Sequence, residues 1–160
     1  MTSLRGLIVL VVDDDEDVRD VLSEMLERAG AVVVAVASGR QALAQLDATP
    51  HPDALVAELL TPDGDGFWLL EQVRERGLTL PVLALAGHLD ARSRPGLLGL
   101  GFADVVLKPV GPADLARAVA LSLGRAAAEG RAGADEVMAA RDERPESLRP
   151  LSTRPRRRRR

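Results

Sequence analysis

The chain of 160 residues contains a single lysine, Lys108, among twenty arginines. Lysine is a compact point charge on a flexible stem, whereas arginine is a wide planar fork, so the two cations suit different ligands. Lys108 follows an apolar run and precedes Pro109, which places it at the end of a predicted strand. The alternative is an ordinary surface lysine. Together with the acids described next, the position predicts a site built around a small anion.

Acidic side chains gather at the ends of two other apolar runs. Asp13–Asp17 is a run of five acids, and Glu58 ends a separate run. Capping of a following helix accounts for one or two of the five, because carboxylates accept hydrogen bonds in the first turn and balance the helix dipole. If Asp13, Asp14 and Glu58 converged, they would repel one another without a divalent cation and an ammonium group beside them. Mg²⁺ prefers oxygen ligands and takes only a few of them from the protein, with water supplying the others.

Five apolar, β-branched runs would position these residues. Four are nearly continuous in hydrophobicity, as expected of strands buried on both faces of a parallel sheet. Their alternation with helix-like stretches predicts a doubly wound five-stranded α/β sheet with helices on both faces. Ligands of such sheets bind at the carboxyl ends of the strands, where the residues above lie. The predicted strands are Leu7–Val12, Ala31–Ala37, Ala54–Leu59, Val82–Ala86 and Ala103–Leu107.

Helix signals separate the runs. Ser38 followed by Gln41 fits a capping box, and Pro112 suits the first position of a helix. Pro95-Gly96 leaves room only for a short fourth helix that begins near Pro95. Apolar residues at helical spacing mark the first and third helices over Val18–Leu26 and Phe67–Val73. In the helix that begins at Pro112 they line one face over Leu115–Leu123, and this helix could extend through Ala126–Ala128.

Charge and composition divide the chain into two parts. Residues 1–123 carry 18 acidic and 10 basic side chains, whereas residues 124–160 carry 6 acidic and 11 basic ones. The second part has too few large apolar side chains to order itself. We therefore expect a folded domain over residues 1–123 and a flexible, disordered Ala/Arg-rich basic tail over residues 124–160.

The composition also excludes several classes of protein. The chain has no cysteine, so disulfides, thiolate zinc sites and cysteine nucleophiles are excluded. The N-terminal apolar run is too short for a signal sequence or a membrane span. We expect a cytoplasmic protein with no membrane partner. Trp68, the only tryptophan, is interpreted as a packing residue or a partly exposed anchor.

The order of these motifs resembles the receiver domain of two-component response regulators. Val-Val-Asp-Asp at residues 11–14, an acid four residues before Pro-Asp-Gly-Asp-Gly at residues 62–66, and Lys-Pro at residues 108–109 match the spacing of that family. The resemblance covers roughly residues 5–123. It implies the flavodoxin-like receiver fold.

The resemblance also implies roles for individual residues. Asp13 and Asp14 would hold Mg²⁺, directly or through water, with Glu58 and the backbone carbonyl of Leu60. Glu58 would stand at the phosphoacceptor position. Lys108 would pair with this acceptor carboxylate and then with the phosphoryl group.

Three positions depart from the family pattern. The family acceptor is aspartate, but this chain has Glu58. Ala86 stands where the family has the Ser or Thr whose hydroxyl contacts the phosphoryl group, and Val105 stands where an aromatic switch residue is common. Pro109, in contrast, matches the family's proline after the lysine, for which a cis peptide is expected.

The departures predict a weak phosphoacceptor. The extra methylene of Glu58 displaces its carboxylate by roughly 1 Å, a misplacement that can cost on the order of 100-fold in rate. Ala86 removes one hydrogen-bond donor for the phosphoryl oxygens. We expect a stand-alone pseudo-receiver in phosphorelay signal transduction that acts by protein–protein interaction and is not an enzyme beyond, at most, phosphotransfer to itself.

Two alternatives stay open. The first is a functional Mg²⁺-dependent receiver that is phosphorylated on Glu58 or on a neighbouring aspartate such as Asp14 or Asp63. The second is a haloacid-dehalogenase-like phosphatase, because residues 13–15 contain the Asp-x-Asp spacing. Such enzymes need a further acidic pair after the lysine, and only Asp114 follows nearby.

The expected partners are proteins. A histidine kinase or a downstream signalling protein would bind the face formed by the fourth helix, the fifth strand and the fifth helix. Arg156–Arg160 would bind an acidic partner or nucleic acid through counterion release, or would have no binding role.

Overall fold

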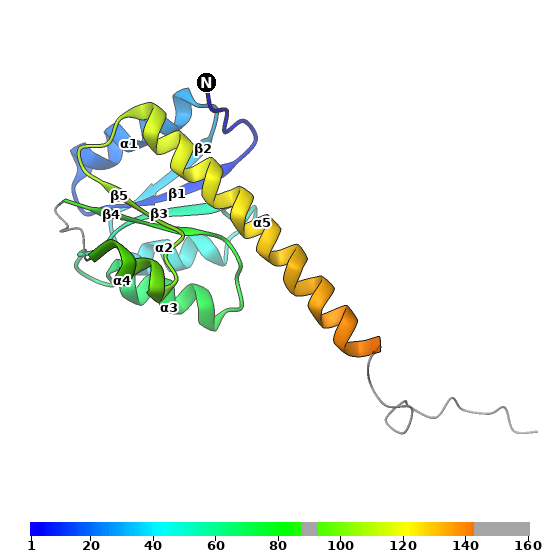
Figure 1. Ribbon diagram of the computed structural model, residues 1–160. Helices are drawn as coiled ribbons and strands as arrows, with labels where there is room; N and C mark the ends of the chain where they lie inside the picture. Colours follow the sequence, from blue (N-terminus) through cyan, green and yellow to red (C-terminus); the bar gives the residue numbers. More distant parts are fainter. Residues whose placement is uncertain (88–92, 143–160) are drawn as a thin grey trace, which may run out of the picture. The chain divides into compact units, whose positions relative to one another are not determined.

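The computed structural model describes residues 1–87 and 93–142, with side chains through residue 129 (Figure 1). One sheet contains five parallel strands in the order β2-β1-β3-β4-β5. This topology confirms the predicted doubly wound receiver fold. Each strand begins and ends within one residue of its predicted range. The strands are β1 (Ile8–Val12), β2 (Val32–Val36), β3 (Ala54–Glu58), β4 (Val82–Ala86) and β5 (Asp104–Leu107).

Helices cover both faces of the sheet (Figure 1). Residues of α1 and α5 pack on one face with Val9 and Val11, while residues of α2, α3 and α4 pack on the other with Leu10 and Val12. Because consecutive side chains of a strand point to opposite faces, two covered faces require a continuous apolar sequence. The helices are α1 (Glu16–Arg28), α2 (Gly39–Leu46), α3 (Gly66–Glu75), α4 (Ser93–Leu100) and α5 (Pro112–Asp142).

Strand β2 forms one edge of the sheet and is less covered than the others. Its sequence is entirely aliphatic, yet Val32 is 58% exposed and Ala35 is also exposed. The strand pairs with β1 on its inner side. Its outer side carries no hydrogen-bonded strand in the described part of the chain.

Side-chain caps begin the first three helices. Asp15 accepts hydrogen bonds from the backbone N–H groups of Asp17 and Val18 at the start of α1. Ser38 accepts one from Gln41 at the start of α2, and the Gln41 amide oxygen accepts one from the N–H of Ala37. The predicted capping box is therefore present, with its return bond one residue earlier than the usual partner.

Helix α4 begins two residues before the predicted start. Pro95 is its third residue. The first four N–H groups of a helix have no partner within the helix, so a proline in this turn costs no hydrogen bond. The helix is nevertheless short, as expected.

Helix α5 is longer than the sequence suggested, since it runs to Asp142 rather than ending by Ala128 at the latest. The residues from 124 onward are rich in Ala, Arg and Glu, which have high intrinsic helix propensity. The chain divides into two compact units, Met1–Ala127 and Ala128–Arg160. Arg156–Arg160 lie outside the described residues.

Candidate functional site

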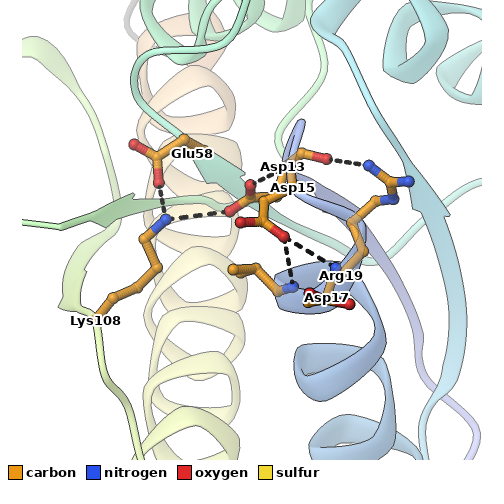
Figure 2. Close-up of polar contacts among 7 residues, drawn as sticks. Asp13, Asp15, Asp17, Arg19, Glu58 and Lys108 are labelled. Carbon is orange, nitrogen blue, oxygen red and sulfur yellow. Dashed lines mark hydrogen bonds and ion pairs between the residues drawn. The ribbon is translucent and has the colours of Figure 1, made fainter.

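Lys108 lies between two carboxylates at the carboxyl edge of the sheet (Figure 2). Its Nζ atom is 2.6 Å from Oε2 of Glu58 and 3.3 Å from Oδ2 of Asp13. The three residues come from the ends of β5, β3 and β1, as the sequence predicted. We call these residues the Lys108 cluster.

The strand order explains how the lysine reaches both acids. Strand β4 lies between β3 and β5, so the Lys108 side chain must pass the end of β4. The last residue of β4 is Ala86, whose carbonyl accepts a hydrogen bond of 2.9 Å from the Lys108 backbone N–H. Neighbouring strands are about 4.8 Å apart, so β3 lies about twice that distance from β5, and the side chains of Lys108 and Glu58 must both extend to close the gap.

Asp13 is held in place by hydrogen bonds in addition to its contact with Lys108. Its side chain is 1% exposed, and Oδ1 accepts a 2.9 Å hydrogen bond from the N–H of Asp15. Its backbone carbonyl accepts a 2.8 Å hydrogen bond from Nη1 of Arg19. A buried carboxylate is costly without a charged partner, and Lys108 supplies that partner.

Glu58 is also largely buried, with its side chain 12% exposed. Its Oε2 atom has no hydrogen-bond partner of acceptable geometry among the described residues, although the Lys108 ammonium is close to it. The contact is therefore an ion pair held by charge and proximity. A buried oxygen of this kind is available to a better-aligned donor or to a cation.

The surroundings of Lys108 change its acidity. Partial burial on its own lowers the pKa of the ammonium, but the contact with Glu58 and the negative charges of Asp13 and Glu58 together raise it above the usual 10.5. Lys108 is therefore protonated at neutral pH. The cluster then has one positive and two negative groups.

The donor chemistry fits Mg²⁺, but the arrangement is only part of a metal site. Asp13 and Glu58 offer hard oxygen atoms, and Asp14, the next residue after Asp13 in the chain, is exposed. No group of three His, Cys, Asp or Glu side chains lies close enough to hold an ion within residues 1–87 and 93–129. Mg²⁺ commonly keeps several waters and uses only one or two protein carboxylates. The carboxylates of Asp13 and Glu58 would therefore be enough protein ligands for this ion. Leu60, whose carbonyl was a predicted ligand, is 74% exposed.

Ala86 and Val105, which differ from the family pattern, both lie in the sheet. Ala86 is 4% exposed at the end of β4 and presents only a methyl group. Val105 is 6% exposed, and its carbonyl accepts a 2.9 Å hydrogen bond from Nη1 of Arg94. The peptide bond between Lys108 and Pro109 is cis, as expected.

Sequence reasoning missed a second cluster of charges, which we call the Asp104 cluster. Asp104 Oδ1 lies 2.6 Å from Nη2 of Arg94, and Asp104 Oδ2 lies 4.0 Å from Nη2 of Arg125. The cluster joins α4, β5 and α5. The only signal in the sequence was an acid at the start of a strand, which is too common to be informative.

Residues 9–120 match the model of the response regulator receiver domain. The chain is 41% identical over 121 residues to an uncharacterized 14.6 kDa protein in the sodA1 3' region of Leptolyngbya boryana, with 74% of this chain and 92% of that protein covered. It is 36% identical over 129 residues to the transcriptional regulatory protein FixJ of Azorhizobium caulinodans, with 79% of this chain and 60% of FixJ covered. It therefore spans most of the first relative but less than two thirds of FixJ.

Solved structures agree with the sequence comparison. A putative response regulator from Chloroflexus aurantiacus is 35% identical, with a TM-score of 0.69, and the match covers 75% of this chain and 99% of that one. The receiver domain of the Francisella response regulator 1452 is 26% identical, also with a TM-score of 0.69, over 75% of this chain and 98% of that one. Within the described residues, no helix has the length and apolar character needed to cross a membrane.

Proposed function

Because the chain belongs to the response regulator receiver domain family of two-component signalling, we propose that it acts there as a pseudo-receiver. In this proposal the protein signals through contact with another protein and is not phosphorylated efficiently. It has no catalytic activity of its own beyond, at most, accepting a phosphoryl group. The substitutions at Glu58 and Ala86 motivate the proposal.

The side chain at the acceptor position is the observation that carries the proposal, because it is a glutamate and not an aspartate. The carboxylate at the acceptor position already lies 2.6 Å from the ammonium. The longer glutamate side chain thus brings negative charge to the lysine without modification. The lysine pairs with the acceptor carboxylate in a working receiver as well, so the distinctive feature here is the extra methylene of Glu58, which moves its carboxylate away from the position that an aspartate would give it.

The end of β4 supports the same conclusion. The Ala86 methyl group cannot donate a hydrogen bond to a phosphoryl oxygen, and a charge-assisted bond of this kind is worth about 1.5–3 kcal/mol. Arg94 meanwhile binds the carbonyl of Val105, the position of the family's aromatic switch. Both features favour a protein that stays in one state.

The proposed partner surface is the face formed by α4, β5 and α5. Large apolar side chains are exposed on each of these elements, which is typical of a protein interaction surface when they are contiguous. Their exposed fractions are 49% for Leu100, 51% for Leu107 and 56% for Leu121. A histidine kinase or a downstream signalling protein is the kind of partner that we propose.

Magnesium is proposed as a weakly bound cation. The receiver family typically binds Mg²⁺, and here Asp13, Asp14 and Glu58 would supply its carboxylate oxygens, with the carbonyl of Leu60. When bound, the ion would neutralise negative charge that Lys108 balances alone in the present arrangement. The pairing of Asp13 and Glu58 with Lys108 competes with this role, so we expect low affinity.

A phosphotransfer assay tests the proposal. The chain and its Glu58→Asp variant are incubated with acetyl phosphate and Mg²⁺, and separately with a histidine kinase, and incorporation of phosphate is measured. We expect little or no labelling of the natural chain and more labelling of the variant. Rapid Mg²⁺-dependent labelling of the natural chain on Glu58 would refute the pseudo-receiver.

A functional phosphoacceptor is the second candidate. It is supported by Asp13, Glu58 and Lys108, which keep the spatial arrangement that such a reaction needs. Mass spectrometry of the labelled chain distinguishes the possible acceptors, namely Glu58, Asp14 and Asp63. Turnover of a generic phosphate ester would instead favour a phosphatase, for which we found no structural support in the described residues.

A further inference from the structure

The loop that follows Glu58 is bound to the start of α2. Residues 59–65 connect β3 to α3, and we call them the acceptor loop. The backbone N–H of Gly39 donates a 2.9 Å hydrogen bond to the carbonyl of Gly64, and the N–H of Arg40 donates one of 3.2 Å to the carbonyl of Asp63. The first N–H groups of a helix normally lack partners. Here the acceptor loop supplies them.

The two backbones approach too closely for side chains at the contact. A Cβ atom on Gly39 would clash with the carbonyl of Gly64. Gly64 has a φ of +91°, and a Cβ atom there would lie 2.7 Å from the Trp68 ring. The contact between the loop and α2 is therefore specific to these two glycines.

Arg40 closes the contact from outside. Its Nε atom lies 2.8 Å from Oδ1 of Asp63, and its Cζ atom lies 5.5 Å from the centre of the Trp68 ring. An exposed ion pair alone contributes little. A guanidinium that also stacks on an aromatic ring has a defined orientation, which lysine cannot reproduce.

Hydrogen bonds within the acceptor loop connect it to the residue that follows Glu58. The Thr61 hydroxyl donates a 2.8 Å hydrogen bond to the carbonyl of Gly64, and the N–H of Gly66 donates one of 3.0 Å to the carbonyl of Leu59. Leu59 follows Glu58 directly and is 6% exposed. These bonds connect the loop to the backbone of the residue after the acceptor position.

We propose that Arg40 is a positioning residue, which holds the acceptor loop against Trp68 and the start of α2 and so keeps Glu58 on Lys108. This inference deepens the proposed function, because it names a residue that maintains the closed ion pair of the pseudo-receiver. It also connects the site to α2 and α3, on the opposite face of the sheet from α1 and α5.

The chain has two internal reporters for a test. Trp68 is the only tryptophan and Lys108 the only lysine. Tryptophan emission and acrylamide quenching report whether the Arg40 contact is present. The rate at which an amine reagent labels Lys108, measured by peptide mass spectrometry, reports whether Glu58 and Asp13 still cover the ammonium. Neither measurement needs a metal ion or a phosphodonor.

In the Arg40→Ala variant we expect a change in Trp68 quenching and about threefold faster labelling of Lys108, because a freed loop opens locally. Arg40→Lys keeps the charge but not the planar stacking, so its labelling rate should fall between those of Arg40→Ala and the natural chain. Arg28→Ala is the matched control, since Arg28 forms an exposed ion pair with Glu24 within α1. It should change neither signal.

Two outcomes would overturn the inference. If Trp68 quenching is unchanged in Arg40→Ala, Arg40 does not hold the loop. If quenching changes but Lys108 is labelled at the natural rate, the loop does not position the site. The phosphotransfer assay decides the proposed function separately, so failure of one proposal is distinguishable from failure of the other.

Discussion

Strand β5 has an ion cluster at each end, and the two clusters are opposite in design. At its carboxyl end, one cation, Lys108, lies between two acids whose side chains are 1% and 12% exposed. At its start, one acid, Asp104, lies between two arginines whose side chains are 53% and 58% exposed. In each cluster the single charge of one sign lies at the centre, between two charges of the opposite sign. Only in the Lys108 cluster are the surrounding charges withdrawn from water.

The difference indicates which cluster the fold depends on. Exposed arginines remain solvated when their partner is lost, so an exposed pair contributes about 0.2–1 kcal/mol. Buried carboxylates cannot recover their solvation in the folded state, so removal of their partner is expensive. We expect loss of the Lys108 cluster to lower the free energy of unfolding of the domain. Loss of the Asp104 cluster should mainly loosen α4.

The largest expected effect comes from removing the cation of the buried cluster. Lys108→Ala leaves Asp13 and Glu58 unpaired and should lower the free energy of unfolding by about 3 kcal/mol. Asp104→Ala, the matched removal of the central charge from the exposed cluster, should cost about 1 kcal/mol or less, because both arginines stay solvated. Urea unfolding followed by Trp68 fluorescence measures both. Equal losses would contradict the distinction between the clusters.

The next effect concerns the centre of the exposed cluster. Asp104→Ala removes the acceptor of Arg94 and should cost about 1 kcal/mol, because charged hydrogen bonds are worth more than neutral ones but this one is partly solvated. Hydrogen exchange should accelerate in α4 and remain unchanged in α1. Equal acceleration in both helices would show that the cluster supports the whole domain rather than α4.

A smaller change is expected at the end of β4. Ala86→Ser places a hydroxyl at a position that is 4% exposed, and without a partner it should lower stability by about 1 kcal/mol. Combined with Glu58→Asp, the same change should increase phosphate incorporation above that of Glu58→Asp alone. No additional labelling in the double variant would show that the missing hydroxyl does not limit phosphorylation.

The smallest effects are those of pH and salt. The pKa of Lys108 is raised in the folded state above 10.5, so its contribution to stability is fully present below the unfolded pKa and is lost as pH rises through the folded value. The stability difference between the natural chain and Lys108→Ala should be constant from pH 7 to about pH 10 and narrow above it. The cost of Asp104→Ala should instead shrink in 1 M salt, where the Debye length is about 3 Å. A strongly salt-dependent Lys108 contribution would contradict its burial.

The sequence predicted the sheet well because buried parallel strands leave a strong signal. All five apolar runs became strands, and Asp13, Glu58 and Lys108 at their ends came together as expected. Asp14 was predicted within the same group but is exposed, because the acids after β1 enter a helix start where successive side chains diverge. Its role stays a prediction, as do those of Glu58, Leu60 and Ala86.

Other features depended on contacts that are distant in sequence. Arg40 and Trp68 are 28 positions apart and meet only because α2 and α3 pack side by side. The Asp104 cluster joins three elements in the same way. The length of α5 was missed for a different reason, since low hydrophobicity was interpreted as disorder although the same residues have high helix propensity.

The aliphatic edge strand β2 has a consequence for handling the protein. Edge strands are usually protected by charge, proline or a bulge against pairing with other chains. Val32–Val36 contain no charged residue and no proline. We therefore expect thermal aggregation to begin there, through intermolecular strand addition at the outer side of β2.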